Sequence, residues 1–128
     1  LAAITDAGGF GQCKALIDID ADGRVDALTD GLMILRYLFG LTGSSLTNSA
    51  VSAGATRSSP AAIQAYLEQI HGALDVDGNA QSDALTDGLL IIRYLFGLRG
   101  SALIQNAVSP GAPRSTVALV EAYIGTLQ

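Results

Sequence analysis

The chain has 128 residues, of which 49% are hydrophobic and 15% are charged, and its formal net charge is -5. This length suits one compact domain, and the large apolar share excludes an intrinsically disordered chain. The seven Lys and Arg residues are scattered along the sequence, so we expect no basic surface for nucleic acid.

The segment before residue 18 carries no charged stretch followed by a cleavage site, and we expect the chain to be part of a longer polypeptide. Cys13 is the only cysteine, so an intramolecular disulfide is excluded and a small buried or incidental thiol is expected. Arg36 and Arg93 interrupt the longest apolar runs, which are shorter than the roughly 18 to 20 residues that span a bilayer. No membrane insertion is therefore expected.

Acidic residues concentrate in two windows, residues 18–30 and 75–87. Of the 12 Asp and Glu residues, five lie in the first window and four in the second. Like charges this close repel one another unless a cation lies among them. Arg24 is the only basic residue in either window. The pattern therefore favours a bound cation, and the alternative is two solvated acidic turns.

The first window has the spacing of an EF-hand calcium loop, which supplies oxygens from its first, third and fifth residues, a carbonyl at the seventh, the ninth residue and a terminal acid. Gly23 allows the sharp turn, and Val25 occupies the position through which such loops usually pair with a partner loop. The predicted ligands of this loop are Asp18, Asp20, Asp22, Arg24 through its carbonyl oxygen, Asp26 and Asp30.

The second window departs from this pattern at two positions, because Ala80 replaces the turn glycine and Ser82 replaces the apolar pairing residue. One ligand loses its charge, and Ala80 must take a backbone conformation that favours glycine, so we expect weaker binding. Two calcium ions are predicted in all. The predicted ligands of this loop are Asp75, Asp77, Asn79, Gln81 through its carbonyl oxygen, Asp83 and Asp87.

Both loops carry their last acid one residue late. The twelfth residue is Thr29 or Thr86, and the acid follows as Asp30 or Asp87. A loop that is one residue longer can still bring this acid onto the ion as a bidentate ligand. The same shift in both copies indicates a systematic variant.

An internal repeat relates the two halves. Residues 26–43 and 83–100, which are 57 positions apart, are identical at 15 of 18 positions. The chain is therefore a tandem duplication, with copies of about residues 15–71 and 72–128 in one domain of residues 1–128. Each copy is expected to contain a calcium loop, a helix, a connector and a second helix, which gives an all-α fold.

The first helix of each copy is expected to begin near Thr29 or Thr86 and to end at Gly40 or Gly97. It is apolar almost all round, so the two central helices should pack together and be covered on most sides, or leave part of their surface for a partner. The connectors, residues 42–59 and 99–115, are predicted to be loops. Amphipathic second helices follow, and their tyrosines are interpreted as core residues.

An acidic loop followed directly by an apolar helix that contains Arg-Tyr, present twice, resembles a type I dockerin. The resemblance covers residues 18–41 and 75–98. It implies a module of a secreted bacterial enzyme that binds two calcium ions through the ligands named above and docks onto a cohesin domain. Partner contacts in that family typically involve a Ser-Thr-like pair before the final acid, where this chain has Ala27, Leu28, Ala84 and Leu85.

Two functions remain open from the sequence. One is a calcium-dependent interaction module with a cohesin-like partner, and the other is a calcium-stabilised structural domain of a larger extracellular protein. An exposed apolar patch on the central helices would favour the first, and complete coverage the second.

No enzyme is expected, because His71 is the only histidine and no catalytic set accompanies it. Met33 is the only methionine, which disfavours a calcium sensor that opens a Met-rich groove. Extracellular calcium would fill such sites permanently, so a secreted or cell-surface bacterial protein is expected.

Overall fold

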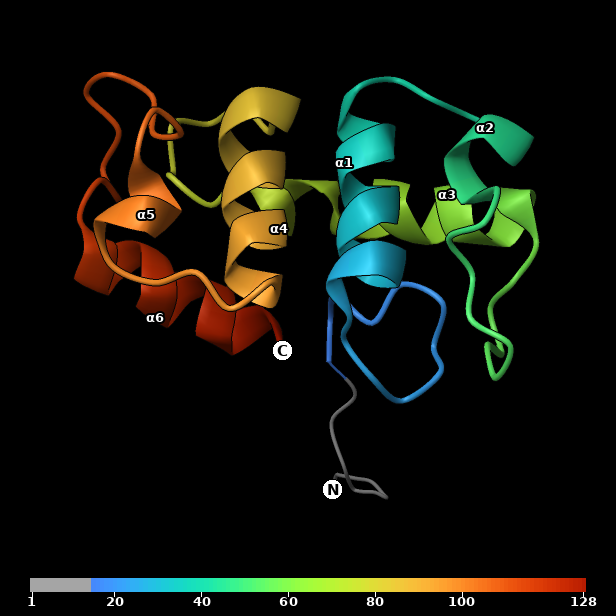
Figure 1. Ribbon diagram of the computed structural model, residues 1–128. Helices are drawn as coiled ribbons and strands as arrows, with labels where there is room; N and C mark the ends of the chain where they lie inside the picture. The colour runs from blue at the N-terminus through green and yellow to red at the C-terminus, as the bar shows by residue number, and fades with distance from the viewer. Residues whose placement is uncertain (1–14) are drawn as a thin grey trace, which may run out of the picture.

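Each copy of the repeat folds into the same order of helices (Figure 1). The computed structural model describes residues 15–128, so the expectation for Cys13 lies outside the described residues. The described residues contain no strand, and the prediction of an all-α fold is confirmed. In chain order the helices are η1 (Ala27–Gly31), α1 (Leu32–Leu38), α2 (Ser44–Thr47), α3 (Pro60–Ile70), η2 (His71–Leu74), η3 (Ala84–Gly88), α4 (Leu89–Leu95), α5 (Ser101–Ile104) and α6 (Val117–Leu127).

The helix after each acidic loop opens with one wide turn. η1 and η3 are π-helical. The amide of Gly31 donates to the carbonyl oxygen of Asp26, five residues back, at 3.1 Å, and the amide of Gly88 makes the matching bond at 3.0 Å. A π turn holds one residue more than an α turn. The extra residue of each loop is therefore absorbed here, and the first helix begins at Ala27 instead of near Thr29.

The two central helices, α1 and α4, lie side by side and run antiparallel (Figure 1). α1 contacts η3, and α4 contacts η1. Two glycines allow this close approach. A Cβ atom added at Gly31 would lie 3.2 Å from Cγ1 of Ile92, and one added at Gly88 would lie 2.9 Å from Cδ1 of Leu35. The matched contacts place the two copies in a near-twofold arrangement.

The connectors are partly helical, which corrects the expectation of loops throughout. α2 follows Gly43, whose φ of 59° lies in the left-handed region that glycine adopts readily. Arg36 holds this turn, because its Nη1 donates to the carbonyl oxygens of Leu46 at 3.2 Å and Asn48 at 2.8 Å. Arg93 makes equivalent bonds to the end of α5. The arginine of each Arg-Tyr pair therefore satisfies carbonyl groups that a short helix leaves without partners.

The longer helices α3 and α6 complete the packing of each copy. Ser59 caps α3 by accepting a hydrogen bond from the amide of Ala62 at 3.2 Å, and Pro60 occupies the first helical position. Within each copy the three α-helices contact one another. One cluster of buried side chains draws on both copies, and its fully buried members include Ile17, Ile19, Met33, Ile34, Leu90 and Ile91.

The central helices are not covered on every side. Their outer faces expose four large apolar side chains, two from each copy: Leu28 (64% exposed), Phe39 (56%), Leu85 (66%) and Phe96 (55%). Within each copy, the leucine lies in the π turn that opens the helix and the phenylalanine caps its C-terminal end. We call these four side chains the exposed apolar set.

Candidate metal centres

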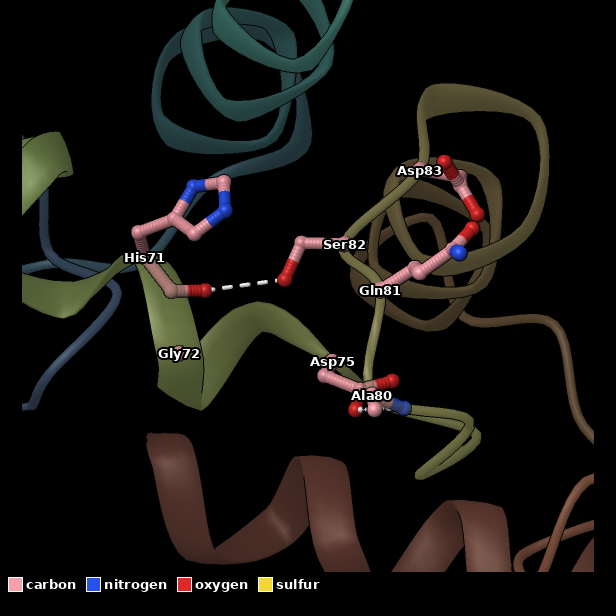
Figure 2. Close-up of a pocket in the computed structure, with 7 residues that line it drawn as sticks. All are labelled: His71, Gly72, Asp75, Ala80, Gln81, Ser82 and Asp83. Carbon is pink, nitrogen blue, oxygen red and sulfur yellow. Dashed lines mark hydrogen bonds between the residues drawn. The ribbon is translucent and has the colours of Figure 1, made fainter.

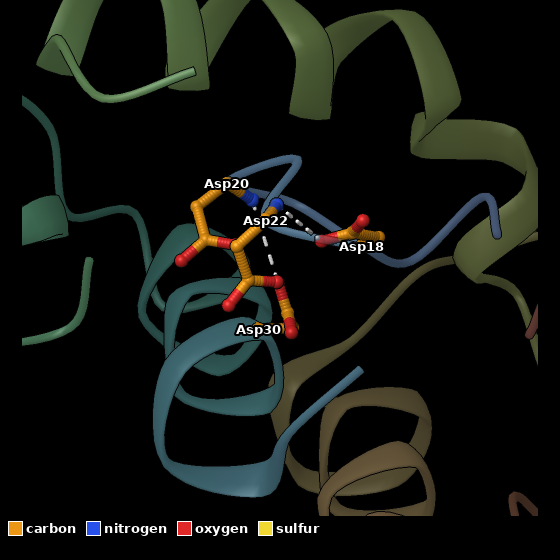
Figure 3. A group of neighbouring side chains, drawn as sticks. All are labelled: Asp18, Asp20, Asp22 and Asp30. Atoms are coloured by element: carbon orange, nitrogen blue, oxygen red, sulfur yellow. Dashed lines mark hydrogen bonds between the residues drawn. The ribbon is translucent and has the colours of Figure 1, made fainter. Parts of the chain in front are cut away.

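Four aspartates of the first loop converge. One carboxylate oxygen from each of Asp18, Asp20, Asp22 and Asp30 lies within 4.8 Å of the others. Figure 3 shows three of them around the turn of the loop, with Asp30 reaching them from the start of the helix. Asp20 and Asp30 have no exposed surface, and Asp18 is 5% exposed. Charges this close and this poorly hydrated repel one another strongly, so the cluster favours a bound cation.

Asp30 joins the beginning of the loop to its end. Its Oδ1 accepts the amide of Ile19 at 2.6 Å and that of Asp20 at 3.4 Å, and its Oδ2 accepts the amide of Asp26 at 2.8 Å. Burial, and to a smaller extent the charge of Asp20, raise the pKa of this carboxyl to about 6. At neutral pH the carboxyl carries a buried charge that a cation would stabilise.

One oxygen of Asp20 provides a test of whether the site suits a cation. Its Oδ2 accepts the amide of Ser52 at 2.9 Å, while its Oδ1 is buried without a hydrogen-bond partner. Buried carboxylate oxygens without donors are rare because they lose the stabilisation that water supplies. A cation within the four aspartates would satisfy this atom. The donor set is oxygen only, which suits a hard ion such as Ca²⁺.

The second loop brings together three aspartates, Asp75, Asp77 and Asp87, under the same 4.8 Å limit. Asp77 and Asp87 have no exposed surface. Asp87 accepts the amide of Asp77 at 3.2 Å and that of Asp83 at 2.8 Å. Burial is the main reason that the pKa of Asp87 rises to about 6. The two acidic groups could therefore hold two metal ions, one for each copy.

An open cavity of about 500 Å³ lies beside the second loop (Figure 2). Asp83 lines this cavity, is exposed, and lies outside the acidic group. Ser82, at the position expected for loop pairing, donates through Oγ to the carbonyl oxygen of His71 at 2.9 Å. No backbone hydrogen bond joins the two acidic loops within residues 15–128. Ser82 therefore ties the second loop to the last residue of the first copy, and not to the first loop.

Each loop has two residues with φ in the left-handed region, and only one of the two is a glycine. In the first loop these residues are Ala21, with φ of 56°, and Gly23, with φ of 88°. In the second they are Gly78, with φ of 76°, and Ala80, with φ of 74°, so the expected strain at Ala80 is present. Because strain occurs in both loops, the uncharged Asn79 is the remaining reason to expect weaker binding at the second.

The structure places seven of the predicted ligands in the two acidic groups. The carboxylates of Asp26 and Asp83 lie outside these groups, and the amides of these residues bond the final acid of each loop instead. The carbonyl ligands from Arg24 and Gln81 and the side-chain ligand from Asn79 stay predictions.

Sequence reasoning missed the part that the connectors and second helices play in the sites. A serine and an arginine contact each loop, and a tyrosine contacts the residue two positions before it: these are Ser52, Arg57 and Tyr66 in the first copy and Ser109, Arg114 and Tyr123 in the second. Tyr66 packs against the hydrophobic cluster, as predicted, and its hydroxyl also donates to the carbonyl oxygen of Leu16 just before the loop. All three residue types recur at the offset of 57, and this identity outside the main motif was the available signal.

Comparison of the chain with family models, with curated proteins and with solved structures finds no match. Among the described residues, no helix has the length and apolar character needed to cross a membrane.

Proposed function

We propose that this chain is a calcium-binding module that takes up two Ca²⁺ ions and, in the loaded state, binds another protein. The observation that carries the proposal is Oδ1 of Asp20, which is buried without a donor among four converging aspartates. Calcium accepts six to eight oxygens in a flexible geometry, whereas magnesium requires a small, nearly octahedral shell and retains several waters. A carboxylate-rich loop with further carbonyl oxygens therefore favours calcium.

The exposed apolar set supports the interaction part of the proposal. Large apolar side chains exposed at both ends of the central helices provide contact area for a partner. Leu28 and Leu85 occupy the stretch that contacts the partner in type I dockerins, which the chain resembles, and a cohesin-like domain is the partner we propose. A secreted or cell-surface location follows from this proposal, because calcium outside cells is abundant enough to keep such sites loaded.

A second function, a calcium-stabilised structural domain, is supported by the packing of the loops. Ile19 and Val76 lie within the loops and are fully buried in the shared hydrophobic cluster. An ion that binds the folded loop and not the unfolded chain would then stabilise the core directly. This function needs no dedicated partner and would leave the exposed apolar set without a role.

Calorimetric titration of the metal-stripped chain with calcium tests the binding proposal. Two binding events are expected, together with a rise in melting temperature, and magnesium should compete weakly. Asp20→Ala should remove one event and Asp77→Ala the other, while the exposed Glu68→Gln control should retain both. An absence of heat and of any stability change at millimolar calcium would refute calcium binding.

Purified cohesin domains, titrated in calcium and in chelator, test the partner. Cohesin binding that requires calcium would support the interaction module. The double variant Phe39→Ser with Phe96→Ser should then lose cohesin binding while it still binds both ions. If no cohesin binds the calcium-loaded chain, the cohesin partner is wrong and the structural function stands in its place.

A further inference from the structure

A serine from each connector holds the acidic loop of its own copy. In the first copy the amide of Ser52 donates to Oδ2 of Asp20 at 2.9 Å, and its hydroxyl donates to Oδ2 of Asp22 at 2.7 Å. The bond to Asp20 engages one carboxylate oxygen and leaves the other, Oδ1, without a partner. Ser52 therefore fixes the direction in which Asp20 presents its free oxygen.

The second copy keeps this contact although one of its partners has changed. The amide of Ser109 donates to Oδ2 of Asp77 at 2.9 Å. Asn79 replaces the aspartate at the fifth position, and its Nδ2 donates to Oγ of Ser109 at 2.9 Å. A hydroxyl can donate to a carboxylate and can equally accept from an amide. The serine hydroxyl is therefore matched to the fifth-position side chain of both loops, whereas alanine would keep only the backbone amide bond to the third-position aspartate.

An arginine and a tyrosine fix the position of the first connector against its loop. The amide of Arg57 donates to the carbonyl oxygen of Asp20 at 3.0 Å. The Nη1 of Arg57 donates to the carbonyl oxygen of Ile19 at 2.8 Å. The guanidinium carbon lies 3.7 Å from the centroid of the Tyr66 ring, which belongs to α3. The carbonyl oxygens on the entry side of the loop are thus held from the second helix.

Arg114 and Tyr123 repeat this arrangement in the second copy. The amide of Arg114 donates to the carbonyl oxygen of Asp77 at 2.9 Å, and its Nε and Nη2 donate to those of Val76 at 2.7 Å and Asp75 at 2.8 Å. Its guanidinium carbon lies 4.0 Å from the centroid of the Tyr123 ring, on α6. The contacts are preserved across the duplication.

We propose that Ser52 and Ser109 are positioning residues of the two calcium sites. Each serine engages the third-position aspartate through its amide and the polar side chain two residues later through its hydroxyl, and so holds both side chains in the orientation that the ion requires. The inference rests on the proposed function, because it names what orients the ligands of those same sites. Since the arginines tie each connector to its loop, ion binding also fixes α3 or α6 against the loop of its own copy.

Alanine and threonine variants of the two serines test this inference by calcium calorimetry. Groups that orient metal ligands typically change affinity by about 10- to 100-fold when removed. Ser52→Ala keeps the backbone bond to Asp20 but removes the hydroxyl bond that orients Asp22, so it should weaken the first site to this extent and leave the second unchanged. Ser109→Ala, which removes the hydroxyl contact with Asn79, should do the reverse. Ser52→Thr, which keeps the hydroxyl, should restore most of the affinity.

Terbium luminescence gives a readout that a merely structural role would not change. Terbium binds in place of calcium, and its lifetimes in light and heavy water report how many waters remain on the ion. A poorly oriented aspartate should be replaced by water, so Ser52→Ala should add bound water at the first site and Ser52→Thr should not.

The outcomes separate the inference from the function on which it rests. If the unaltered chain binds no calcium, the proposed function fails. If it binds two ions and both alanine variants keep the same affinities and hydration, the positioning role is overturned while calcium binding stands. Circular dichroism establishes folding, and should Ser52→Ala not fold, Ser109→Ala decides by the same criteria.

Discussion

The metal-free protein should become more stable as the pH falls from 7 to about 4.5. Burial is the first cause that raises the pKa of Asp30 and Asp87 to about 6, whereas an unfolded aspartate titrates near 3.9. Between about pH 6 and 3.9 the folded state therefore binds protons that the unfolded state does not. The free energy of unfolding rises as the pH falls through this window.

The size of the effect follows from the two pKa shifts. One pH unit corresponds to about 1.4 kcal/mol, so each carboxyl contributes on the order of 2 to 3 kcal/mol across the window. Burial also raises the pKa of Asp18, which acts in the same direction. The hydroxyl of Ser52 lowers the pKa of Asp22, and this opposite contribution is lost only below about pH 3.9, outside the window.

Bound calcium should reverse the sign of this dependence. The ion requires charged carboxylates, so protonation of Asp30 and Asp87 releases it and the calcium-loaded protein loses stability on acidification. The two curves of unfolding free energy against pH should therefore converge as the pH falls.

Urea unfolding of the metal-stripped chain, repeated in millimolar calcium between pH 7 and 4.5, measures both curves. Asp30→Asn removes one of the two titrating groups, and roughly half of the rise in the metal-free curve should remain. A metal-free curve that is flat, or that falls with decreasing pH, would refute the assignment of buried, uncompensated charge to these two residues.

Three further predictions concern the backbone, the helix pair and the surface. Ala80→Gly should raise the free energy of urea unfolding by about 0.5 to 1 kcal/mol, because it relieves a left-handed φ of 74° at some entropic cost. Gly88→Leu should lower the free energy of unfolding by about 2 kcal/mol or more, because even a Cβ at this position would lie 2.9 Å from Cδ1 of Leu35. Gly72→Leu, at a position with open space around it, serves as the control. Phe39→Ser should leave the melting temperature nearly unchanged, because the side chain is 56% exposed, and a fall of many degrees would contradict this.

Local spacing was sufficient to predict the acidic groups. Asp18, Asp20 and Asp22 alternate along one turn, and their convergence needs only the conformation of that turn. The late acid Asp30 was also placed correctly in the group, because one extra residue can be absorbed near a helix start. That the extra residue forms a π turn beginning at Ala27 was beyond the sequence pattern, since α and π turns share the same apolar periodicity over so few residues.

The contacts that brace the loops were not predictable from local pattern. Ser52 bonds Asp20 across 32 positions of sequence, and no periodicity reports such a distance. The connector helix α2 has only four residues, too few to show a helical repeat. The exposure of Phe39 was undetermined for a different reason: an apolar helix face looks the same in sequence whether it meets the core or a partner.

The differences between the two loops are accommodated by the same surrounding residues, which change only their contacts. Where the fifth-position aspartate has become Asn79, the Ser109 hydroxyl accepts a hydrogen bond instead of donating one. The second loop has its glycine at position 78, where the first loop has Ala21. The absence of a side chain there leaves room for the Arg114 guanidinium, because a Cβ added at Gly78 would lie only 3.3 Å from its central carbon. These altered contacts maintain similar support for a loop that carries less charge. The second copy therefore keeps a site organised for a cation, with one negative charge fewer to hold it.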